Sequence, residues 1–349
     1  MDTKKNIIQK NKSWAIILVA QFLLFYIMSK SDFAVNFFSQ LFDWKKYWHI
    51  PLFSEISFSA GDVIYIITAA LICYLISMSI KRRTAKYIKH LLIIGNIFYF
   101  TYQCFWGMLY FQPPLITKMK NKNISESNLK KLTIKYLNIC KAERELLNED
   151  KNGVFKVYDE EKIKNEILKQ QKLLPKKICS KNPIQNLSIK PSLFNSFMNK
   201  TGILGYYNPF TSEAQYNPNI PSTQLPFTIA HEMSHQLGYA REQEASFIGF
   251  LCAKRSNSPE LNYSADLYAL KSLLRAVSVN DDVFRNRILS SFSDKMKKDR
   301  EYEMKFIKAN EGILSDFFGV TNDLFLKSNQ QEGSVTYSYF VNLLVMYEI

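Results

Sequence analysis

Histidine is scarce in this sequence, with 4 among 349 residues, and cysteine is hardly more common, with 5. No two cysteines form a CxxC pair, so the usual spacing of a cysteine-ligated zinc site is absent. Cys73 and Cys104 fall inside apolar runs. The other three, Cys140, Cys179 and Cys252, allow one disulfide that the sequence does not require. Cysteine chemistry is therefore not what distinguishes this chain.

The chain also lacks any motif of a nucleic-acid-binding protein, although its formal net charge is +14. Its lysines and arginines flank apolar runs near the N-terminus or are scattered along polar stretches. It contains no internal repeat and no long low-complexity tract. We therefore expect no nucleic-acid partner and interpret the basic charge as solvated surface and membrane flank.

Three apolar runs lie near the N-terminus, at residues 13–29, 58–80 and 88–111. A transmembrane helix needs about 20 mostly apolar residues. Residues 1–112 are therefore predicted to form a membrane anchor with three transmembrane helices in the lipid bilayer. The first run follows basic residues, as the core of a signal peptide would, but no small-residue cleavage site follows it. An uncleaved anchor is the interpretation we favour.

Basic residues also predict the orientation of this multi-pass membrane protein, because positive charge gathers on the cytoplasmic side. Two clusters are present: Lys4, Lys5, Lys10 and Lys12 before the first run, and Lys81, Arg82, Arg83, Lys86 and Lys89 between the second and third. We therefore expect a cytoplasmic N-terminus and an extracytoplasmic segment 113–349, on the periplasmic or outer face. Residues 37–48 mix aromatics with charges, which fits either a stretch along the outer membrane surface or an ordinary outer loop.

Residues 113–349 predict a second domain that is mainly helical with a small sheet. Residues 187–216 are rich in proline, glycine, serine and β-forming residues, which indicates two or three short strands. From Pro226 onward the pattern is helical almost to the end of the chain, with an early break at Gly238. Residues 205–216 fit either an edge strand to which a peptide adds or a structural hairpin. The predicted fold class is α+β, mainly α.

The helical half opens with the sequence HEMSH, residues 231–235, an HExxH pattern. On a helix His231 and His235 lie one turn apart on the same side, so both imidazoles can bind one Zn²⁺. Glu232 lies about 100° around the axis, beside the metal, where it can serve as general base. Half of the chain's four histidines fall in this motif. The alternative is that both are surface histidines on an amphipathic helix.

A catalytic zinc needs a third protein ligand, and Glu242 and Glu244 are the nearest candidates. On a straight helix Glu242 would lie about 10 Å beyond His235, too far for a shared metal. The chain must turn back, and Gly238 permits such a turn. On a second helix from residue 242 the two glutamates differ by about 200°, so only one can face the metal. Periodicity alone leaves both open.

The stretch from Leu225 to Phe247, LPFTIAHEMSHQLGYAREQEASF, resembles the gluzincins, zinc peptidases whose third ligand is a glutamate on a later helix. Several gluzincin families place this glutamate three residues before an alanine, which implies Glu242 as ligand, before Ala245. The acid or amide that usually supports the first histidine would be Ser246. The resemblance implies a zincin-like domain with Zn²⁺ as cofactor and a peptide or protein as substrate.

Nearly the whole chain is also similar to a bacterial family of membrane-anchored proteins known as domain of unknown function 3810. The stretches that carry this similarity include FSAGDVIY (58–65), WGMLYFQPPL (106–115), YNPFTSEAQYNP (207–218) and YFVNLLVMYE (339–348). The resemblance implies a zinc metallopeptidase-like domain outside the membrane.

The remaining parts of a peptidase site are less defined by the sequence. An oxyanion stabiliser would have to be Tyr239, Arg241 or a later tyrosine such as Tyr337, because no histidine follows His235. The first hypothesis is a membrane-anchored zinc peptidase. The alternative is a non-catalytic zinc- or peptide-binding envelope protein with a degenerate site. A transporter is poorly supported, since the ionisable residues near the spans, Asp62, Lys89 and His90, all lie near their ends.

Overall fold

A computed structural model describes residues 2–119, 124–278, 281–329 and 339–349 of the chain, with two compact units. The N-terminal unit comprises Met1–Gln112 together with Asn208–Glu213. The C-terminal unit comprises Pro113–Tyr207 and Ala214–Ile349. The described chain is mainly helical with one sheet of three strands, which confirms the predicted class of α+β, mainly α.

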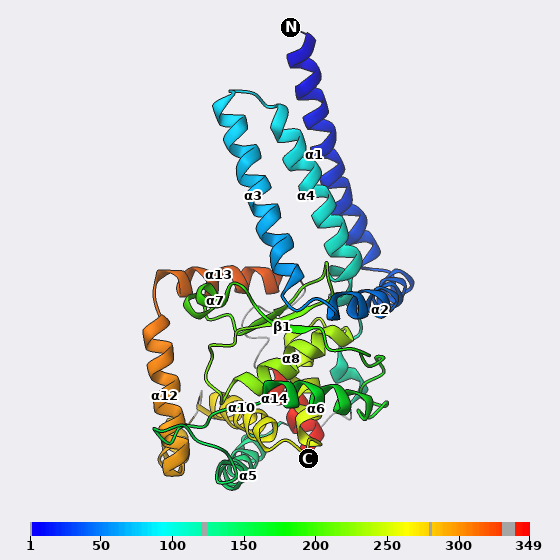
Figure 1. Cartoon of the computed structure of the whole chain (residues 1–349). Helices are drawn as coiled ribbons and strands as arrows, with labels where there is room; N and C mark the ends of the chain where they lie inside the picture. Colours follow the sequence, from blue (N-terminus) through cyan, green and yellow to red (C-terminus); the bar gives the residue numbers. More distant parts are fainter. Residues whose placement is uncertain (1, 120–123, 279–280, 330–338) are drawn as a thin grey trace. The chain divides into compact units, whose positions relative to one another are not determined.

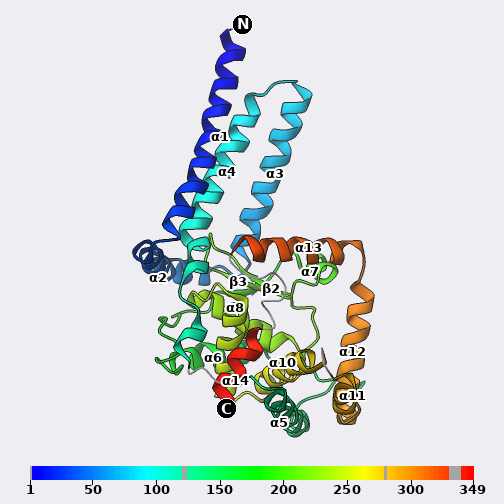
Figure 2. The same cartoon turned by 180° about the vertical axis from the view of Figure 1, so that it is seen from behind.

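Long helices make up the N-terminal unit. They are α1 (Asp2–Met28), α2 (Asp32–Ser54), α3 (Ala60–Lys81) and α4 (Lys86–Phe105), followed by the short 3-10 helix η1 (Gly107–Phe111). Figure 1 and Figure 2 both show α4 between α1 and α3, with α2 running at an angle to α1. A small apolar core of Phe25, Val35, Phe38 and Met108 joins α1, α2 and η1.

Within the described residues two helices are long and apolar enough to cross a membrane, Gln9–Met28 and Ala60–Lys81, so the expectation of three such spans is corrected to two. The third predicted run, 88–111, is divided between α4 and η1. Polar residues lower its apolar character, and one of them, Asn96, is buried. The Asn96 amide donates to the carbonyl of Trp14 at 3.1 Å and accepts from Gln21 of α1 at 3.1 Å. Its polar groups are thus satisfied by protein.

The loop Asn208–Glu213 packs within the N-terminal unit, although it lies far along the chain. The buried carboxylate of Glu213 accepts from the backbone N–H groups of Ala60 at 3.1 Å and Gly61 at 2.6 Å. It therefore caps the first turn of α3, where a negative charge is also favoured by the helix dipole. The ring of Phe210 lies 4.8 Å from that of Phe98 on α4, and Lys45 of α2 donates to the Pro209 carbonyl.

The C-terminal unit places a small sheet beside a group of helices. The sheet has the order β1-β3-β2, with β1 (Ile189–Pro191) parallel and β2 (Gly205–Tyr207) antiparallel to β3 (Ala214–Tyr216). The helices are η2 (Leu115–Lys118), α5 (Glu126–Arg144), α6 (Glu160–Lys172), α7 (Asn195–Thr201), α8 (Leu225–Leu237), α9 (Glu242–Lys254), α10 (Pro259–Ser278), α11 (Asp282–Ser290), α12 (Asp294–Asn310), α13 (Ile313–Ser328) and α14 (Tyr339–Glu348).

The core of this unit forms around α8 and α9, which pack on each other and on α10. All three strands also contact α8, so the HEMSH helix lies between the sheet and the other helices (Figure 1). Its inner residues, among them Ile229, Ala230 and Met233, have no exposed surface. Burial on this scale fixes the position of α8, because each fully buried aliphatic side chain contributes about 1.5–3 kcal/mol.

A pair of carboxyl groups lies where α5 packs on α10. Glu143 and Asp266 are hydrogen-bonded to each other, which requires a shared proton. Burial, together with the neighbouring Asp266 charge, raises the pKa of Glu143 to about 8. Burial raises the pKa of Asp266 to about 6, although Lys254 opposes this shift. The folded chain therefore holds protons at these carboxyls that an unfolded chain would release near pH 4.

We expect the thermal stability of the full chain in detergent to fall as pH rises from about 5 to about 8. Over this range the native state binds more protons than the unfolded state, so the free energy of unfolding decreases with pH. The Glu143→Gln variant should flatten this dependence, because the amide can bond Asp266 without a shared proton. Melting temperatures at a series of pH values test this, with Glu145→Gln on the exposed side of the same turn as control. An unchanged slope in Glu143→Gln would contradict the assignment.

Candidate metal centre

Helix α8 carries the histidines and ends where the sequence predicts a turn. Pro226 occupies its first turn, where a missing N–H costs no hydrogen bond. Gly238 closes the helix with φ of 105°, a left-handed conformation that side chains disfavour, and its N–H bonds the His235 carbonyl at 2.9 Å. The chain then reverses, and α9 begins at Glu242.

Close packing of α9 on α8 depends on Gly249. A methyl group at this position would lie 3.1 Å from the carbonyl carbon of Ala230 and 3.1 Å from the backbone nitrogen of His231. The two helix backbones therefore approach each other next to the first histidine of the motif. This approach is what lets a glutamate at the start of α9 reach the side chains of α8.

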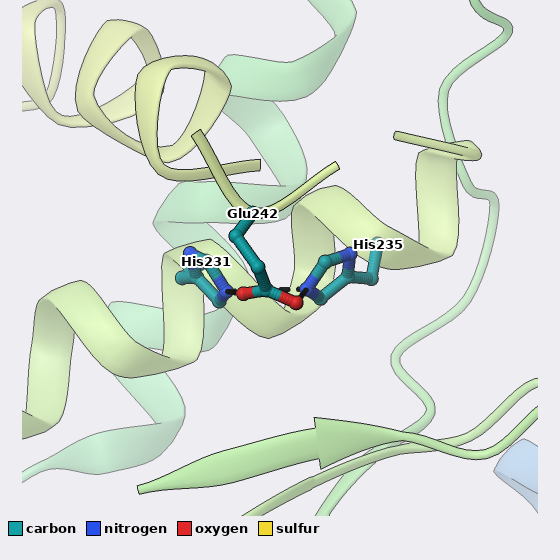
Figure 3. Close-up of side chains that lie close together, drawn as sticks. All are labelled: His231, His235 and Glu242. Carbon is teal, nitrogen blue, oxygen red and sulfur yellow. Dashed lines mark hydrogen bonds and ion pairs between the residues drawn. The ribbon is translucent and has the colours of Figure 1, made fainter. Parts of the chain in front are cut away.

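The structure brings His231, His235 and Glu242 together (Figure 3). One potential ligand atom from each lies within 4.8 Å of the others. His231 Nε2 is 3.2 Å from Glu242 Oε2 and 3.1 Å from His235 Nε2, and His235 Nε2 is 3.8 Å from Glu242 Oε1. Ligands of a tetrahedral zinc lie about 3–3.5 Å apart, given bonds of about 2 Å. The spacing of these atoms thus suits a single metal ion.

Each histidine is held by its second ring nitrogen, which leaves Nε2 facing Glu242. His235 Nδ1 lies 2.6 Å from the carbonyl oxygen of Tyr239, and His231 Nδ1 lies 3.0 Å from the hydroxyl oxygen of Ser246. A backbone carbonyl can only accept, so His235 carries its proton on Nδ1. This is the arrangement in which the partners of metal-binding histidines fix the ring and its tautomer.

The charges in this cluster favour a cation between the three side chains. Burial opposes ionisation of Glu242, but hydrogen bonds to His231 and His235 outweigh it and hold the pKa of Glu242 well below its usual range. Burial likewise opposes protonation of His235, yet its hydrogen bond to Glu242 raises its pKa to about 9. For His231 burial prevails and lowers the pKa. His235 is therefore protonated beside the Glu242 carboxylate. Its proton supplies the positive charge that a metal ion between the three side chains could supply instead.

Glu232 lies on the same helix, between the helix axis and strand β2. Burial raises its pKa to about 8, and its Oε2 atom has no hydrogen-bond partner among the described residues. A methyl group at Gly205 of β2 would lie 2.6 Å from both Cγ and Oε1 of Glu232. Gly205 therefore makes room for this carboxyl group, which can exchange a proton near neutral pH.

Glu244, the other candidate ligand, is placed elsewhere. Its carboxylate accepts from the backbone N–H of Leu115 at 2.7 Å and lies 3.4 Å from Arg241. The guanidinium of Arg241, a candidate oxyanion stabiliser, is therefore paired with Glu244. Tyr239 is buried, and burial together with the nearby Cys179 raises the pKa of its hydroxyl. Tyr337 lies outside the described residues.

The sequence did not indicate two further contacts of the site. The hydroxyl of Tyr268 on α10 donates to Ser246 at 3.3 Å, so it adds a second link behind His231. Gly205 covers Glu232 from the sheet. Both residues come from elements remote in the chain, and no motif connects them to HEMSH. Gly249 falls in an apolar run of α9, where a glycine could have indicated a close helix approach.

We expect Gly249→Ala to lower the melting temperature of the full chain by the equivalent of about 1–3 kcal/mol, because the added methyl group overpacks the α8–α9 contact. The matched control is Gly319→Ala in α13, where a methyl group meets nothing within 4 Å. That variant should be neutral or slightly stabilising, since alanine favours a helix. Equal melting temperatures for the two variants would show that α8 and α9 accommodate the added methyl group without cost.

Comparison with known proteins gives one family. No curated protein and no solved structure matches the chain significantly. The model of a family described as "Protein of unknown function (DUF3810)" matches residues 37–345, which spans most of both units. The chain belongs to the DUF3810 family of proteins of unknown function.

Proposed function

We propose that this protein is a membrane-anchored, zinc-dependent peptidase. The observation that carries the proposal is the convergence of His231, His235 and Glu242 within 4.8 Å, with Glu232 on the same helix. Two histidines and one glutamate are the ligand set of several catalytic zinc sites, which keep a further coordination position for water or substrate. A structural zinc site would normally close that position with a fourth protein ligand.

The residues present fit zinc chemically. In both histidines Nδ1 is hydrogen-bonded and Nε2 faces Glu242, which is ionised. Metal binding would require only that the charged His235 release the proton on its Nε2 atom. Side chains of His231 and Glu242 keep 14% and 16% of their surface exposed, so the site has access to solvent. When bound, zinc would lower the pKa of a coordinated water toward about 7 and polarise a substrate carbonyl.

Glu232 is the proposed general base. Its carboxylate would take a proton from the attacking water and pass it to the nitrogen of the departing amine. Two features of this chain suit that role. Burial and the nearby Glu242 charge raise its pKa to about 8, close to the working pH at which proton transfer in both directions is efficient. Gly205 leaves one side of the carboxyl group free of a neighbouring side chain.

Strand β2 is the proposed binding edge for an extended peptide. It lies at one end of the strand order and contacts α8. A peptide that adds to such an edge gains backbone hydrogen bonds without requiring particular side chains. Gly205, on this strand, would then lie against both the peptide and Glu232. This arrangement would bring the scissile bond to the base from the side of the sheet.

The anchor is proposed to place the C-terminal unit outside the cytoplasm. Among the described residues, helices α1 and α3 are the two that are long and apolar enough to cross the bilayer by themselves; α4, which fails that test, packs on both and would enter the membrane only as their partner. Its buried Asn96 is bonded to α1, which lowers the cost of a polar group in lipid. The helix α2, with exposed Phe33, Trp44 and Trp48, would lie in the outer interface, where aromatic side chains are enriched.

The first test is the metal content of the purified full chain, measured by elemental analysis. We expect one zinc per chain in the wild type and in Glu244→Gln, and loss of zinc in Glu242→Gln. Glu244→Gln is a matched control, because the amide oxygen can still accept from Leu115. Zinc lost in Glu244→Gln but kept in Glu242→Gln would assign the third ligand to Glu244.

The second test is cleavage of unfolded proteins and of a quenched-fluorescent peptide library by the zinc-loaded chain. Glu232→Gln should keep its zinc and lose activity by about 10²–10⁴-fold, because proton transfer is removed while the ligands remain. Activity that survives this change would refute the assignment of the base.

A second candidate is a non-catalytic zinc- or peptide-binding envelope protein. It is favoured by Ser246, a neutral hydroxyl where a carboxylate or amide usually supports the first histidine. Peptides that bind equally to wild type and Glu232→Gln, with zinc present and no product from either, would select this function.

A further inference from the structure

Helix α13 exposes an apolar face that is large for a surface helix. Along one side it carries Ile313, Phe317, Val320 and Leu324, which are 88%, 63%, 63% and 60% exposed, flanked by Leu314 and Phe325. The spacing of three and four residues keeps these side chains on a single stripe. Contiguous apolar patches of this kind mark interaction surfaces rather than ordinary protein surface.

The exposed stripe is not the result of an unpacked helix. The opposite side of α13 packs inward, with Leu326 only 1% exposed and the ring of Phe318 5.1 Å from that of Phe197 on α7. Asp323 and Lys327 form an ion pair of 2.6 Å along one flank. The helix thus has a packed side, a charged flank and an unpartnered apolar side, which is the pattern of a helix that lies in a membrane interface.

Connectivity links this helix to the part of the chain that we propose enters the bilayer. Helix α7, on which α13 packs, ends at Thr201, and strand β2 follows at Gly205–Tyr207. The next residues, Asn208–Glu213, belong to the N-terminal unit and cap α3, one of the two apolar helices. A tether of six residues, 202–207, therefore joins the α7–α13 pair to a loop bound at the end of a candidate span.

We propose that α13 is an interfacial helix whose apolar stripe inserts into the lipid surface of the same membrane that holds the N-terminal unit. The occupant is the phospholipid boundary between head groups and acyl chains. Burial of four large apolar side chains there is favourable, and Lys308, in the last turn of α12 just before α13, suits a phosphate group. The inference rests on the proposed membrane anchoring, but not on zinc or peptidase activity.

Spin-label accessibility in vesicles tests the inference on the full chain. Cys73 and Cys104 are replaced by serine, because the other three cysteines are buried. Single cysteines are introduced as Phe317→Cys and Leu324→Cys on the stripe. The matched control is Lys305→Cys on the exposed side of α12, and Leu71→Cys on α3 reports the anchor. The vesicles contain equal parts of phosphatidylethanolamine and phosphatidylglycerol.

We expect labels at 317, 324 and 71 to be more accessible to oxygen, which dissolves in lipid, than to a water-soluble nickel chelate. The label at 305 should show the reverse. Melting temperatures equal to that of the parent would show that the labelled chains fold. A lipid signal at 71 with a water signal at 317 and 324 would overturn the inference and leave the anchor intact.

Two other outcomes are equally decisive against it. Labels at 317 and 324 that are shielded from both reagents would show that protein covers the stripe, and spin–spin broadening would identify that protein as a second copy of this chain. A water signal at 71 as well would overturn the membrane anchoring itself.

Discussion

The candidate metal centre depends on the close approach of the α8 and α9 backbones. Gly238 reverses the chain in a left-handed conformation, and Gly249 allows the two helices to touch beside His231. If the chain did not reverse at Gly238, Glu242 would lie about 10 Å beyond His235 along a continuous helix, and the two histidines would have no third partner. Two glycines thus determine whether the three candidate ligands meet. The same packing buries α8 between the sheet and α10, which leaves Glu232 and His235 little exposed surface.

The electrostatics of the centre are unusually simple for a buried site. Its negative charge comes mainly from Glu242, because burial raises the pKa of Glu232 to about 8 and the support of His231 is a neutral hydroxyl. Tyr268 extends that support with a second neutral group. A hydroxyl increases the basicity of an imidazole less than a carboxylate does. We expect a bound metal at this site to retain more of its positive charge, which would favour polarisation of a carbonyl over tight metal retention.

Local patterns in the sequence predicted the parts of the site that lie close together in the chain. Pro226, the HEMSH motif and Gly238 indicated where α8 begins, what it carries and where it ends, because each acts within one or two turns of helix. The choice between Glu242 and Glu244 was different. Periodicity allowed either, and only the family resemblance favoured Glu242. In the structure Glu244 is held by Leu115, a contact across 129 residues that no local pattern can reveal.

The sequence was less informative wherever distant segments meet. The third apolar run seemed long enough to cross a membrane by itself, but it does not pass the test of hydropathy that α1 and α3 pass. Its buried Asn96 is bonded to α1, a distant partner that hydropathy counted along the chain cannot register. Tyr268 and Gly205 reach the site from α10 and β2 for similar reasons. Residues 205–216 were interpreted as an edge strand or a hairpin, and no local pattern showed that Asn208–Glu213 packs in the other unit.

Because the loop Asn208–Glu213 packs within the N-terminal unit, the N-terminal helices cannot be removed without loss of that loop's contacts. A chain cut at Gln112 would leave Glu213 without the two N–H groups of α3 that it caps and Phe210 without its aromatic neighbour on α4. The loop follows β2 directly, so its disorder would spread into the strand that lies against Glu232. Insertions and deletions between the two units should therefore be tolerated poorly in evolution. The two units are expected to be inherited together, as one indivisible module.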